Sequence, residues 1–354
     1  MTARSLSGQD GRVEDAANER GGRVVAAFDK FRDTATSREL GDAAARAARA
    51  RGREVEVVAL SDGGEGFLDA FSGDDTRLAV PGPLGETVLA RLRLHESADG
   101  LVGVIESADV VGRHLLARPT RGEALVASSA GLGHLILEGA RRGATRLLVG
   151  CGGSATSDAG LGCYQVLRAA GGLPVPVTAA TDVTASFRDA RRYAGQKGVA
   201  PEDLARIDER LELAHSLYVE DYGVDVESVA RTGAAGGIAG ALFALGASLV
   251  GGFELVAREV DLAARLAGAA LVVTGEGRLY GGTLEGKVVS GVADLATGPL
   301  LVVCGSLDDE AASTFSSRHP DARLVSLEEK CGLERALADA PGCVEALLAA
   351  ALEG

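Results

Sequence analysis

Short apolar runs alternate with helix-forming segments along this chain, and this alternation limits the folds that it can adopt. Residues 24–27 and 55–60 are apolar runs of strand length, and the Ala- and Arg-rich segment 37–51 between them has the composition of a helix. The same order of helix and strand returns at 132–142, 146–149, 159–170, 271–273, 285–295 and 300–304. Strands that alternate with helices are typical of βαβ units and a parallel sheet. We therefore expect an α/β fold.

The length of the chain indicates more than one domain. A chain of 354 residues is longer than one compact core usually accommodates, so the default expectation is two α/β domains. Residues 1–22 are polar and charged, and we expect them to form a loose tail. The polar stretch 181–225 contains a charged segment, 201–217, which predicts a helix at the surface or on a moving cap.

Composition and charge exclude several classes of protein. The longest apolar runs, such as 299–304, fall far short of the roughly 20 residues that span a bilayer, so we expect no membrane segment. The five cysteines form no CxxC pair and are odd in number, which indicates reduced thiols and a cytoplasmic protein. A formal net charge of −14 disfavours nucleic acid as a partner, but it does not exclude a nucleotide, which needs only a few local donors.

A glycine-rich turn, Gly150–Gly160, lies between a predicted strand and a predicted helix. In this position glycines let the backbone approach a ligand, and the N-terminus of the helix favours an anion. The turn is not a Walker loop, because no Gly-Lys-Ser or Gly-Lys-Thr follows it. The alternative is a tight turn in which Ser157 or Asp158 caps the helix.

Acidic residues follow the first two predicted strands. Asp62 and Glu65 lie in a glycine-rich turn after the second strand, where two carboxylates can hold Mg²⁺ together with water and phosphate. The alternative is an acidic turn in which Asp62 caps a helix. Asp29 follows the first strand and is a candidate base or metal ligand. Since ligands of α/β enzymes bind at the carboxyl ends of the strands, the positions of these three residues favour a role in a ligand site.

A third group of charged residues follows the predicted strand 271–273. Glu276 and Arg278 come directly after it, and Lys287 lies at the start of the next helix. A carboxylate, a guanidinium and an ammonium at one strand end suit a triphosphate with its metal, or the carboxylate of a small acid. The glycine-rich segment Gly233–Gly240 is a further helix entry, for which close packing is at least as good an explanation as phosphate binding.

Seven short motifs occur in one order along the chain. They read AFDKFRDTAT, SDGGEGF, VIESADVVG, CGGSATSDAG, GQKG, GAAGG and VVTGEGR. In sequence and in order these segments resemble the motifs of the glycerate kinase family found mainly in bacteria. The resemblance runs from about residue 23 to about residue 306.

The resemblance implies a fold, an activity and cofactors. The fold is α/β with two domains, in which a flavodoxin-like domain, 86–264, is inserted into a discontinuous α/β domain formed by 23–85 and 265–354. The activity is transfer of the γ-phosphoryl group of ATP, with Mg²⁺, to a hydroxyl of glycerate or a closely related small hydroxy acid. The partners are then a nucleotide and a small acid, and the assembly remains open, with a homodimer among the alternatives.

The resemblance also assigns roles to individual residues. The catalytic group comprises Asp158, Asp29, Lys197 and Arg278, the nucleotide-binding group comprises Gly152, Gly153, Ser154, Thr156, Glu276 and Lys287, and the metal ligands are Asp62 and Glu65. Such groups mostly position the reactants and neutralise charge in phosphoryl transfer. Asp158 is the expected acceptor of the hydroxyl proton.

The chain departs from the family pattern at four places. Arg32 and Asp33 stand where the family has Lys and Gly, the segment 185–187 replaces Asn-Pro-Leu, and Tyr280 replaces an Asp. A phenol with a pKa near 10 does not act as a carboxylate at neutral pH. These departures leave two alternatives to glycerate phosphorylation: a diverged enzyme that phosphorylates or nucleotidylates another acid, for example a phosphonate analogue, and a non-catalytic descendant that binds a metabolite.

Overall fold

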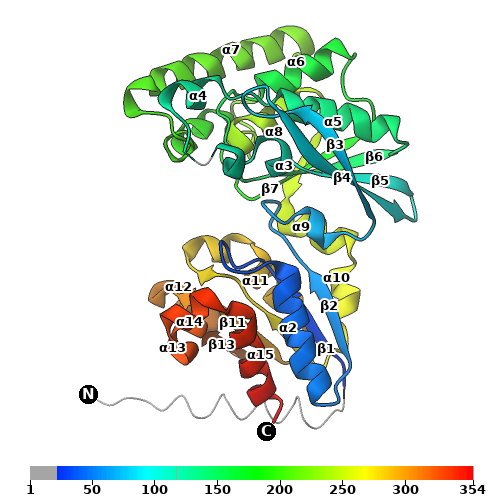
Figure 1. Ribbon diagram of the computed structural model, residues 1–354, viewed down its shortest axis with the longest axis vertical. Helices are drawn as coiled ribbons and strands as arrows, with labels where there is room; N and C mark the ends of the chain where they lie inside the picture. Colours follow the sequence, from blue (N-terminus) through cyan, green and yellow to red (C-terminus); the bar gives the residue numbers. More distant parts are fainter. Residues whose placement is uncertain (1–21, 117, 354) are drawn as a thin grey trace. The chain divides into compact units, whose positions relative to one another are not determined.

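The computed structural model describes residues 22–116 and 118–353, which divide into two compact units (Figure 1). The terminal unit consists of the residues up to Asp62 and those from Phe253 onward, and the inserted unit consists of Gly63–Gly252. The predicted loose tail, 1–22, lies outside the described residues except for Gly22.

The terminal unit contains a five-stranded parallel sheet. Its strands are β1 (Val24–Phe28), β2 (Val55–Ala59), β9 (Leu271–Thr274), β11 (Leu300–Cys304) and β13 (Ala322–Ser326), in the order β13-β11-β9-β1-β2. Counted along the chain, this is the 2-1-3-4-5 order of flavodoxin-like sheets, in which the order reverses between β1 and β9. Ligands of such sheets bind at the carboxyl ends of the strands beside that reversal.

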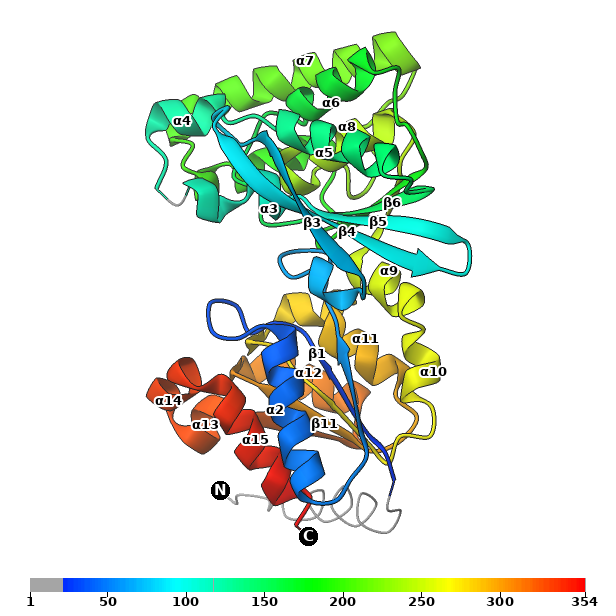
Figure 2. The same ribbon diagram turned by 45° about the vertical axis from the view of Figure 1, so that its right-hand side comes forward.

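Helices from opposite ends of the chain cover one face of this sheet. Helices α2 (Ser37–Ala50) and α15 (Ala340–Ala351) lie side by side and share one hydrophobic core with β1, β9 and β11 (Figure 2). The face that α2 buries is made mostly of alanines, and a Cβ on Gly41 would come within 2.4 Å of Val57, so small residues let the helix approach the sheet closely. A Thr36–Glu39 capping box begins α2.

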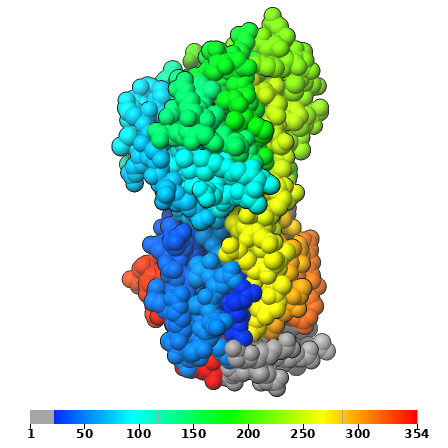
Figure 3. All heavy atoms as spheres, turned by 90° about the vertical axis from the view of Figure 1, so that its right-hand side faces the viewer, coloured from blue at the N-terminus to red at the C-terminus, as the bar shows by residue number. Residues whose placement is uncertain are grey.

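The remaining elements of the terminal unit follow the strands. They are α9 (Gly252–Glu259), α10 (Leu262–Leu266), β10 (Arg278–Leu279), a short helix at Gly281–Glu285, α11 (Val288–Leu295), β12 (Ser306–Leu307), α12 (Asp309–Arg318), α13 (Leu327–Cys331) and α14 (Leu333–Ala338). The space-filling view in Figure 3 shows how residues before 62, in blue, pack against residues after 253, in yellow and orange. The two ends of the chain therefore build one core.

The inserted unit contains a six-stranded mixed sheet. Its strands are β3 (Asp74–Pro81), β4 (Thr87–Ser97), β5 (Gly100–Glu106), β6 (Arg146–Cys151), β7 (Val177–Thr181) and β8 (Ser248–Gly251), in chain order across the sheet. Strands β3 to β5 pair antiparallel, and β5 to β8 pair parallel. The helices are α3 (Ala108–Val111), α4 (Arg121–Val126), α5 (Ala130–Arg141), α6 (Leu161–Ala169), α7 (Leu204–Tyr222) and α8 (Ile238–Ala244).

The α/β class expected from the sequence is confirmed, and its details differ. The flavodoxin-like strand order occurs in the terminal unit and not in the inserted one. The first division between the units follows Asp62 and not residue 85, because β3 pairs with β4 along its whole length and so belongs to the inserted sheet. The second division falls at 252 and not at 264. Among the described residues, no helix has both the length and the apolar character of a membrane span.

Candidate active site

A cavity of about 920 Å³ lies in the terminal unit at the carboxyl ends of its strands. Its lining includes residues that follow β1, β2, β9, β11 and β13, so it spans the point where the strand order reverses. Five residues predicted from the sequence line it: Asp29, Asp62, Glu276, Arg278 and Lys287. The topology and the predicted residues thus indicate the same edge of the sheet as a ligand site.

Backbone contacts fix the segment that carries Glu276. The carbonyl of Gly275 accepts a hydrogen bond from Asp29 N at 3.2 Å, and the carbonyl of Glu276 accepts one from Gly305 N at 3.0 Å. A Cβ on Gly275 would lie 1.8 Å from the carbonyl oxygen of Val303, so only glycine fits there. The segment is thereby held between the ends of β1 and β11.

Carboxylates and ammonium groups alternate along the floor of the cavity. Lys30 Nζ lies 3.8 Å from Asp29 Oδ1 and 3.6 Å from Asp62 Oδ1, and Lys287 Nζ lies 3.3 Å from Asp62 Oδ2. Lys30 was not among the residues assigned a role from the sequence, because a lysine near a turn is more often only solvated. Its position between the buried carboxylate of Asp29 and the partly buried carboxylate of Asp62 shows that it belongs to this cluster.

Burial changes the proton affinity of two carboxyl groups in the cluster. Burial raises the pKa of Asp29 to about 6, an effect that Lys30 partly opposes and the Asp62 charge reinforces. Burial raises the pKa of Glu276 to about 8, against a hydrogen bond from the Thr283 side chain that lowers it. Glu276 Oε1 is buried and has no hydrogen-bond partner among the described residues. A bound ligand or ion at this oxygen would satisfy it.

We expect Glu276→Gln to stabilise the ligand-free protein at pH 8. Below about pH 4.5 the buried carboxyl of Glu276 is protonated and costs the folded protein nothing. As the pH rises through about 8 this stability is lost, because the carboxyl must ionise in a buried site. Gln does not ionise and avoids this loss. The free energy of unfolding at pH 8 should rise by about 1–3 kcal/mol, with little change at pH 5. Urea denaturation of both proteins in the presence of a chelator measures the difference, and equal stabilities at pH 8 would show that Glu276 is ionised there at no cost.

The cavity residues fit magnesium bound with phosphate and do not fit an all-protein metal cage. In the described part of the chain, no group of three or more His, Cys, Asp or Glu residues is arranged to hold an ion. Mg²⁺ commonly takes one or two carboxylates and completes its shell with water and phosphate oxygens. Asp62 and the unsatisfied oxygen of Glu276 are donors of this type. Glu65, the other predicted ligand, is an exposed residue of the inserted unit.

The predicted glycine turn lies in the inserted unit between β6 and α6, and Asp158 organises it. Asp158 Oδ2 accepts hydrogen bonds from the backbone N and the Oγ of Ser129, both at 2.7 Å, and from Gly162 N at 3.1 Å. Its Oδ1 accepts one from Gly160 N at 3.0 Å. The buried carboxylate of Asp158 therefore accepts four hydrogen bonds and joins the starts of α5 and α6, as in the capping alternative. Because its oxygens are already hydrogen-bonded, the case for Asp158 as a base is weaker.

Lys197 is buried against the same turn. Its Nζ donates to Ser154 Oγ at 2.9 Å and to the carbonyl oxygen of Thr156 at 2.8 Å. Burial lowers the pKa of Lys197 to about 8, although the charges of Asp158 and Asp182 raise it. A lysine that is partly neutral near pH 8 and fixed by two acceptors holds the turn in one conformation.

The glycines of the turn permit close backbone packing. A Cβ on Gly152 would come within 2.5 Å of the Gly64 backbone, and Gly153 has a positive φ of 65°. A Cβ on Gly236 would lie 2.2 Å from the carbonyl oxygen of Thr156. The segment Gly233–Gly240 therefore packs directly on the turn, which agrees with the packing alternative for it. Thr156 Oγ1 donates to the carbonyl oxygen of Ala127 at 2.8 Å.

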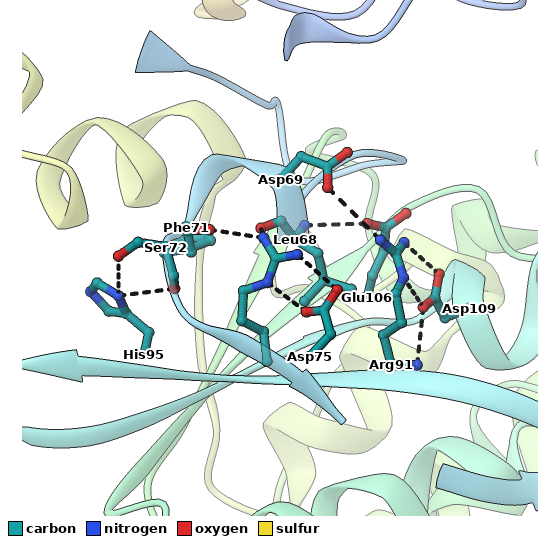
Figure 4. A network of polar contacts seen from close by, with 10 residues as sticks. Leu68, Asp69, Phe71, Ser72, Asp75, Arg91, His95, Glu106 and Asp109 are labelled. Carbon is teal, nitrogen blue, oxygen red and sulfur yellow. Dashed lines mark hydrogen bonds and ion pairs between the residues drawn. The ribbon is translucent and has the colours of Figure 1, made fainter. Parts of the chain in front are cut away.

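Glu106 holds the end of the glycine-rich turn that contains Glu65, a role that sequence reasoning did not identify. Its two oxygens accept hydrogen bonds from Gly66 N at 3.1 Å and Leu68 N at 3.3 Å, and burial raises its pKa to about 7. Figure 4 shows the neighbouring contacts, in which Arg91 forms a bidentate pair with Asp109. Arg93 donates to the carbonyl oxygens of Leu68 and Phe71. The VIESADVVG motif contained Glu106, but only the fold shows what it binds.

Three of the departures from the family pattern, Arg32, Asp33 and Tyr280, line the cavity. Tyr280 is 42% exposed, and its ring centroid lies 5.6 Å from Lys287 Nζ. Asp33 has a left-handed φ of 60°, which explains why glycine suits that position. In the inserted unit, the altered segment 185–187 includes Phe187, which is fully buried and fills the space beside Gly240. That departure therefore changes packing.

We expect Asp33→Gly to raise the free energy of unfolding by about 0.5–1 kcal/mol. The left-handed conformation costs an L residue about 1–2 kcal/mol, and the greater freedom of glycine in the unfolded chain offsets part of the gain. Denaturant unfolding measures the change, with Asp33→Asn as the control, because Asn removes the charge and keeps a residue that tolerates this conformation. A larger gain from Asn than from Gly would assign the effect to charge and not to backbone strain.

The comparisons with known proteins identify the family. The model of the glycerate kinase family matches residues 24–172 and 173–353. The glycerate 2-kinase of Escherichia coli K12 is 32% identical over 81% of this chain and 86% of its own length, and the glycerate kinase of Halalkalibacterium halodurans is 30% identical over 86% of this chain and 92% of its own. A crystal structure of a candidate glycerate kinase 2 from Salmonella typhimurium LT2 superposes with a TM-score of 0.73 at 28% identity, covering 93% of this chain and 98% of that one.

This chain belongs to the glycerate kinase family. It is accordingly a kinase, an enzyme whose phosphoryl acceptor is a hydroxyl group. The resemblance found in the seven motifs is thus confirmed over the whole matched length.

Proposed function

We propose that this enzyme transfers the γ-phosphoryl group of ATP to a hydroxyl of glycerate, with Mg²⁺ as the metal. The observation that carries the proposal is the cavity at the strand reversal, in which the carboxylates of Asp29 and Asp62 alternate with the ammonium groups of Lys30 and Lys287. Phosphoryl transfer requires positioning and charge neutralisation more than covalent chemistry, and this set supplies both.

Each cavity residue has a proposed role. Lys287 and Arg278 contact phosphate oxygens, and Lys30 holds the Asp29 and Asp62 carboxylates in place. Asp29 accepts the proton of the attacking hydroxyl, because a base acts best when its pKa lies near the working pH. Asp62 and Glu276 would hold Mg²⁺, which supplies neutralisation of the phosphate charge when bound.

The residues of the glycine turn have a positioning role in this proposal. Asp158 holds the starts of two helices, and Lys197 holds Ser154 and Thr156 through hydrogen bonds. The backbone of Gly152 and Gly153 remains the proposed anion contact, as the family motif implies. Glu65 remains a proposed second metal ligand. A cytoplasmic setting, the absence of nucleic-acid partners and a homodimer also remain predictions from the sequence.

The test of the proposed function is release of ADP that depends on substrate. The purified chain is incubated with ATP, Mg²⁺ and a panel of small hydroxy acids that includes both enantiomers of glycerate, and ADP is followed in a coupled assay. Glycerate should support ADP release well above the rate without acid. No release with any acid of the panel would contradict the proposal.

Tyr280 favours a second candidate, phosphorylation of a hydroxy acid other than glycerate. Its exposed ring lines the cavity where the family has a carboxylate. Introducing Tyr280→Asp restores the family residue beside Lys287. If glycerate is the natural acceptor, the substitution should leave its kcat/KM unchanged or lower it. An increase of about tenfold or more in the kcat/KM for glycerate would favour the second candidate.

A further inference from the structure

The cavity of the terminal unit has an apolar part that the proposed chemistry does not use. Six of its lining residues carry methyl or aliphatic groups: Leu284, Ala311, Thr314, Leu333, Ala336 and Leu337. Leu333 and Leu337 lie one helical turn apart on α14 and are 54% and 61% exposed. Together with Tyr280, they are the large hydrophobic side chains left exposed in the described part of the terminal unit, and all three line this one cavity.

The apolar part and the charged part lie at different positions along the sheet edge. Helix α14 follows β13, at one edge of the sheet, whereas Asp62 follows β2 at the other edge and Asp29 follows its neighbour β1. Strands β13 and β1 are three strand spacings apart, which is roughly 14 Å at about 4.8 Å per spacing. The cavity therefore has a long dimension with cations toward one end and leucines toward the other.

The charges along the cavity orient any phosphorylated ligand. Lys30 and Lys287 lie at the β1 side, whereas Glu310 and Glu328 line the cavity together with the apolar residues. At the β1 side these lysines offset the charges of Asp29 and Asp62. A carboxylate whose charge is not offset repels phosphate, and it accepts hydrogen bonds from hydroxyl and amino groups. A ligand with a phosphate chain at one end and an apolar ring with amino and hydroxyl donors at the other fits this distribution.

We propose that the apolar part of this cavity, formed by Leu333, Leu337 and Ala336 of α14 with Ala311 of α12 and Leu284, binds the purine base of the nucleotide, with the ribose beside Glu310 and Glu328. This inference rests on the proposed function, which supplies the nucleotide, and adds where its base binds. A volume of about 920 Å³ lies within the range of small-molecule sites, which bury most of a ligand against apolar walls. The purine ring covers Leu333 and Leu337, and burial of this apolar surface contributes to the affinity for the nucleotide.

Binding of two probes tests the inference, because ADP carries the base and tripolyphosphate lacks it. Both are titrated calorimetrically, with Mg²⁺, into the full chain and into the Leu333→Ala/Leu337→Ala variant. The variant should bind ADP at least tenfold more weakly, and its affinity for tripolyphosphate should stay within twofold of the wild type. The matched control is Leu213→Ala, which removes a leucine that is 54% exposed in the inserted unit and should change neither affinity.

The outcomes separate this inference from the proposed function. An ADP affinity within twofold of the wild type in the double variant, in an enzyme that releases ADP with a hydroxy acid, would overturn the base site and leave the kinase function intact. A wild type that binds neither probe and releases no ADP would overturn both. Equal weakening of ADP and tripolyphosphate would also contradict the base site, and circular dichroism of the variant checks that the fold is retained.

Discussion

Replacing Asp29 with Asn should lower kcat by about 10²–10⁴-fold while the affinity for ADP changes little. The amide keeps the size of the side chain and its place at the end of β1, but it cannot accept the hydroxyl proton, and general base catalysis contributes about this much. Asp29 is 7% exposed, and its Oδ1 accepts a hydrogen bond from Lys30 N at 2.8 Å. Steady-state kinetics with saturating ATP and acid measure the loss.

The pH dependence of the same enzyme provides an independent check on Asp29. Because burial raises the pKa of Asp29 to about 6, kcat/KM should fall as the pH drops below about 6, since the protonated carboxyl cannot act as a base. The matched control is Asp42→Asn on the exposed side of α2, which should leave both kcat and the profile unchanged. A fully active Asp29→Asn enzyme would show that Asp29 is not the base, and Asp158 would then be the remaining candidate.

Replacing Lys287 with Met should lower kcat/KM by about 10²–10³-fold. Lys287 Nζ lies 3.3 Å from Asp62 Oδ2, and its side chain is 23% exposed, so Met keeps the packing and removes the charge. The substitution removes a cation that neutralises the phosphate charge in the transition state. A single stabilising group of this kind contributes about 10²–10³-fold to the rate. Unlike the leucine variant, Lys287→Met should weaken ADP and tripolyphosphate alike, because the phosphate chain is the part that loses a contact.

The control for this prediction is Lys330→Met. Lys330 lies on α13 in the same unit, is exposed and does not line the cavity, so its removal should leave kcat/KM within twofold of the wild type. Measuring kcat/KM for ATP with both variants separates a local effect from a general effect of net charge. Wild-type kinetics in Lys287→Met would show that the phosphate chain does not bind at this side of the cavity.

The strand ends were the most predictable part of the site. A strand of a parallel sheet and the turn after it are local in sequence, so Asp29 and Glu276 could be assigned to the carboxyl edge from their neighbours alone. That they line one cavity follows from the parallel pairing of β1 with β9. The sequence could not provide this pairing, because more than 200 residues separate the two strands.

The antiparallel strands were the least predictable part of the fold. Strands β3, β4 and β5 were absent from the prediction, and the domain boundary at residue 85 would separate β3 from its partner β4. The alternation of strands and helices predicts βαβ units, and consecutive strands joined by short turns do not fit that pattern. The strand order of each sheet is likewise beyond a local pattern, since order is a property of long-range pairing.

The roles of buried polar residues depend on partners that are distant in sequence. Asp158 was expected to take a proton, but Ser129, which lies 29 residues earlier, donates twice to its carboxylate. Glu106 accepts from Gly66, 40 residues earlier. A motif shows that such a residue has a function, whereas the fold shows whether the side chain is available to a ligand or already satisfied.

The chemistry of the transferred group tests the central claim most directly. Phosphorus NMR of a reaction that contains the wild-type enzyme, ATP, Mg²⁺ and glycerate distinguishes the products without a coupling enzyme. We expect ADP and one new phosphomonoester resonance to grow together, in a ratio of one to one, and both to grow about 10²–10⁴-fold more slowly with Asp29→Asn. Formation of pyrophosphate with a nucleotidylated acid, or no change in ATP while glycerate is present, would contradict the assignment of this chain as a kinase that phosphorylates glycerate.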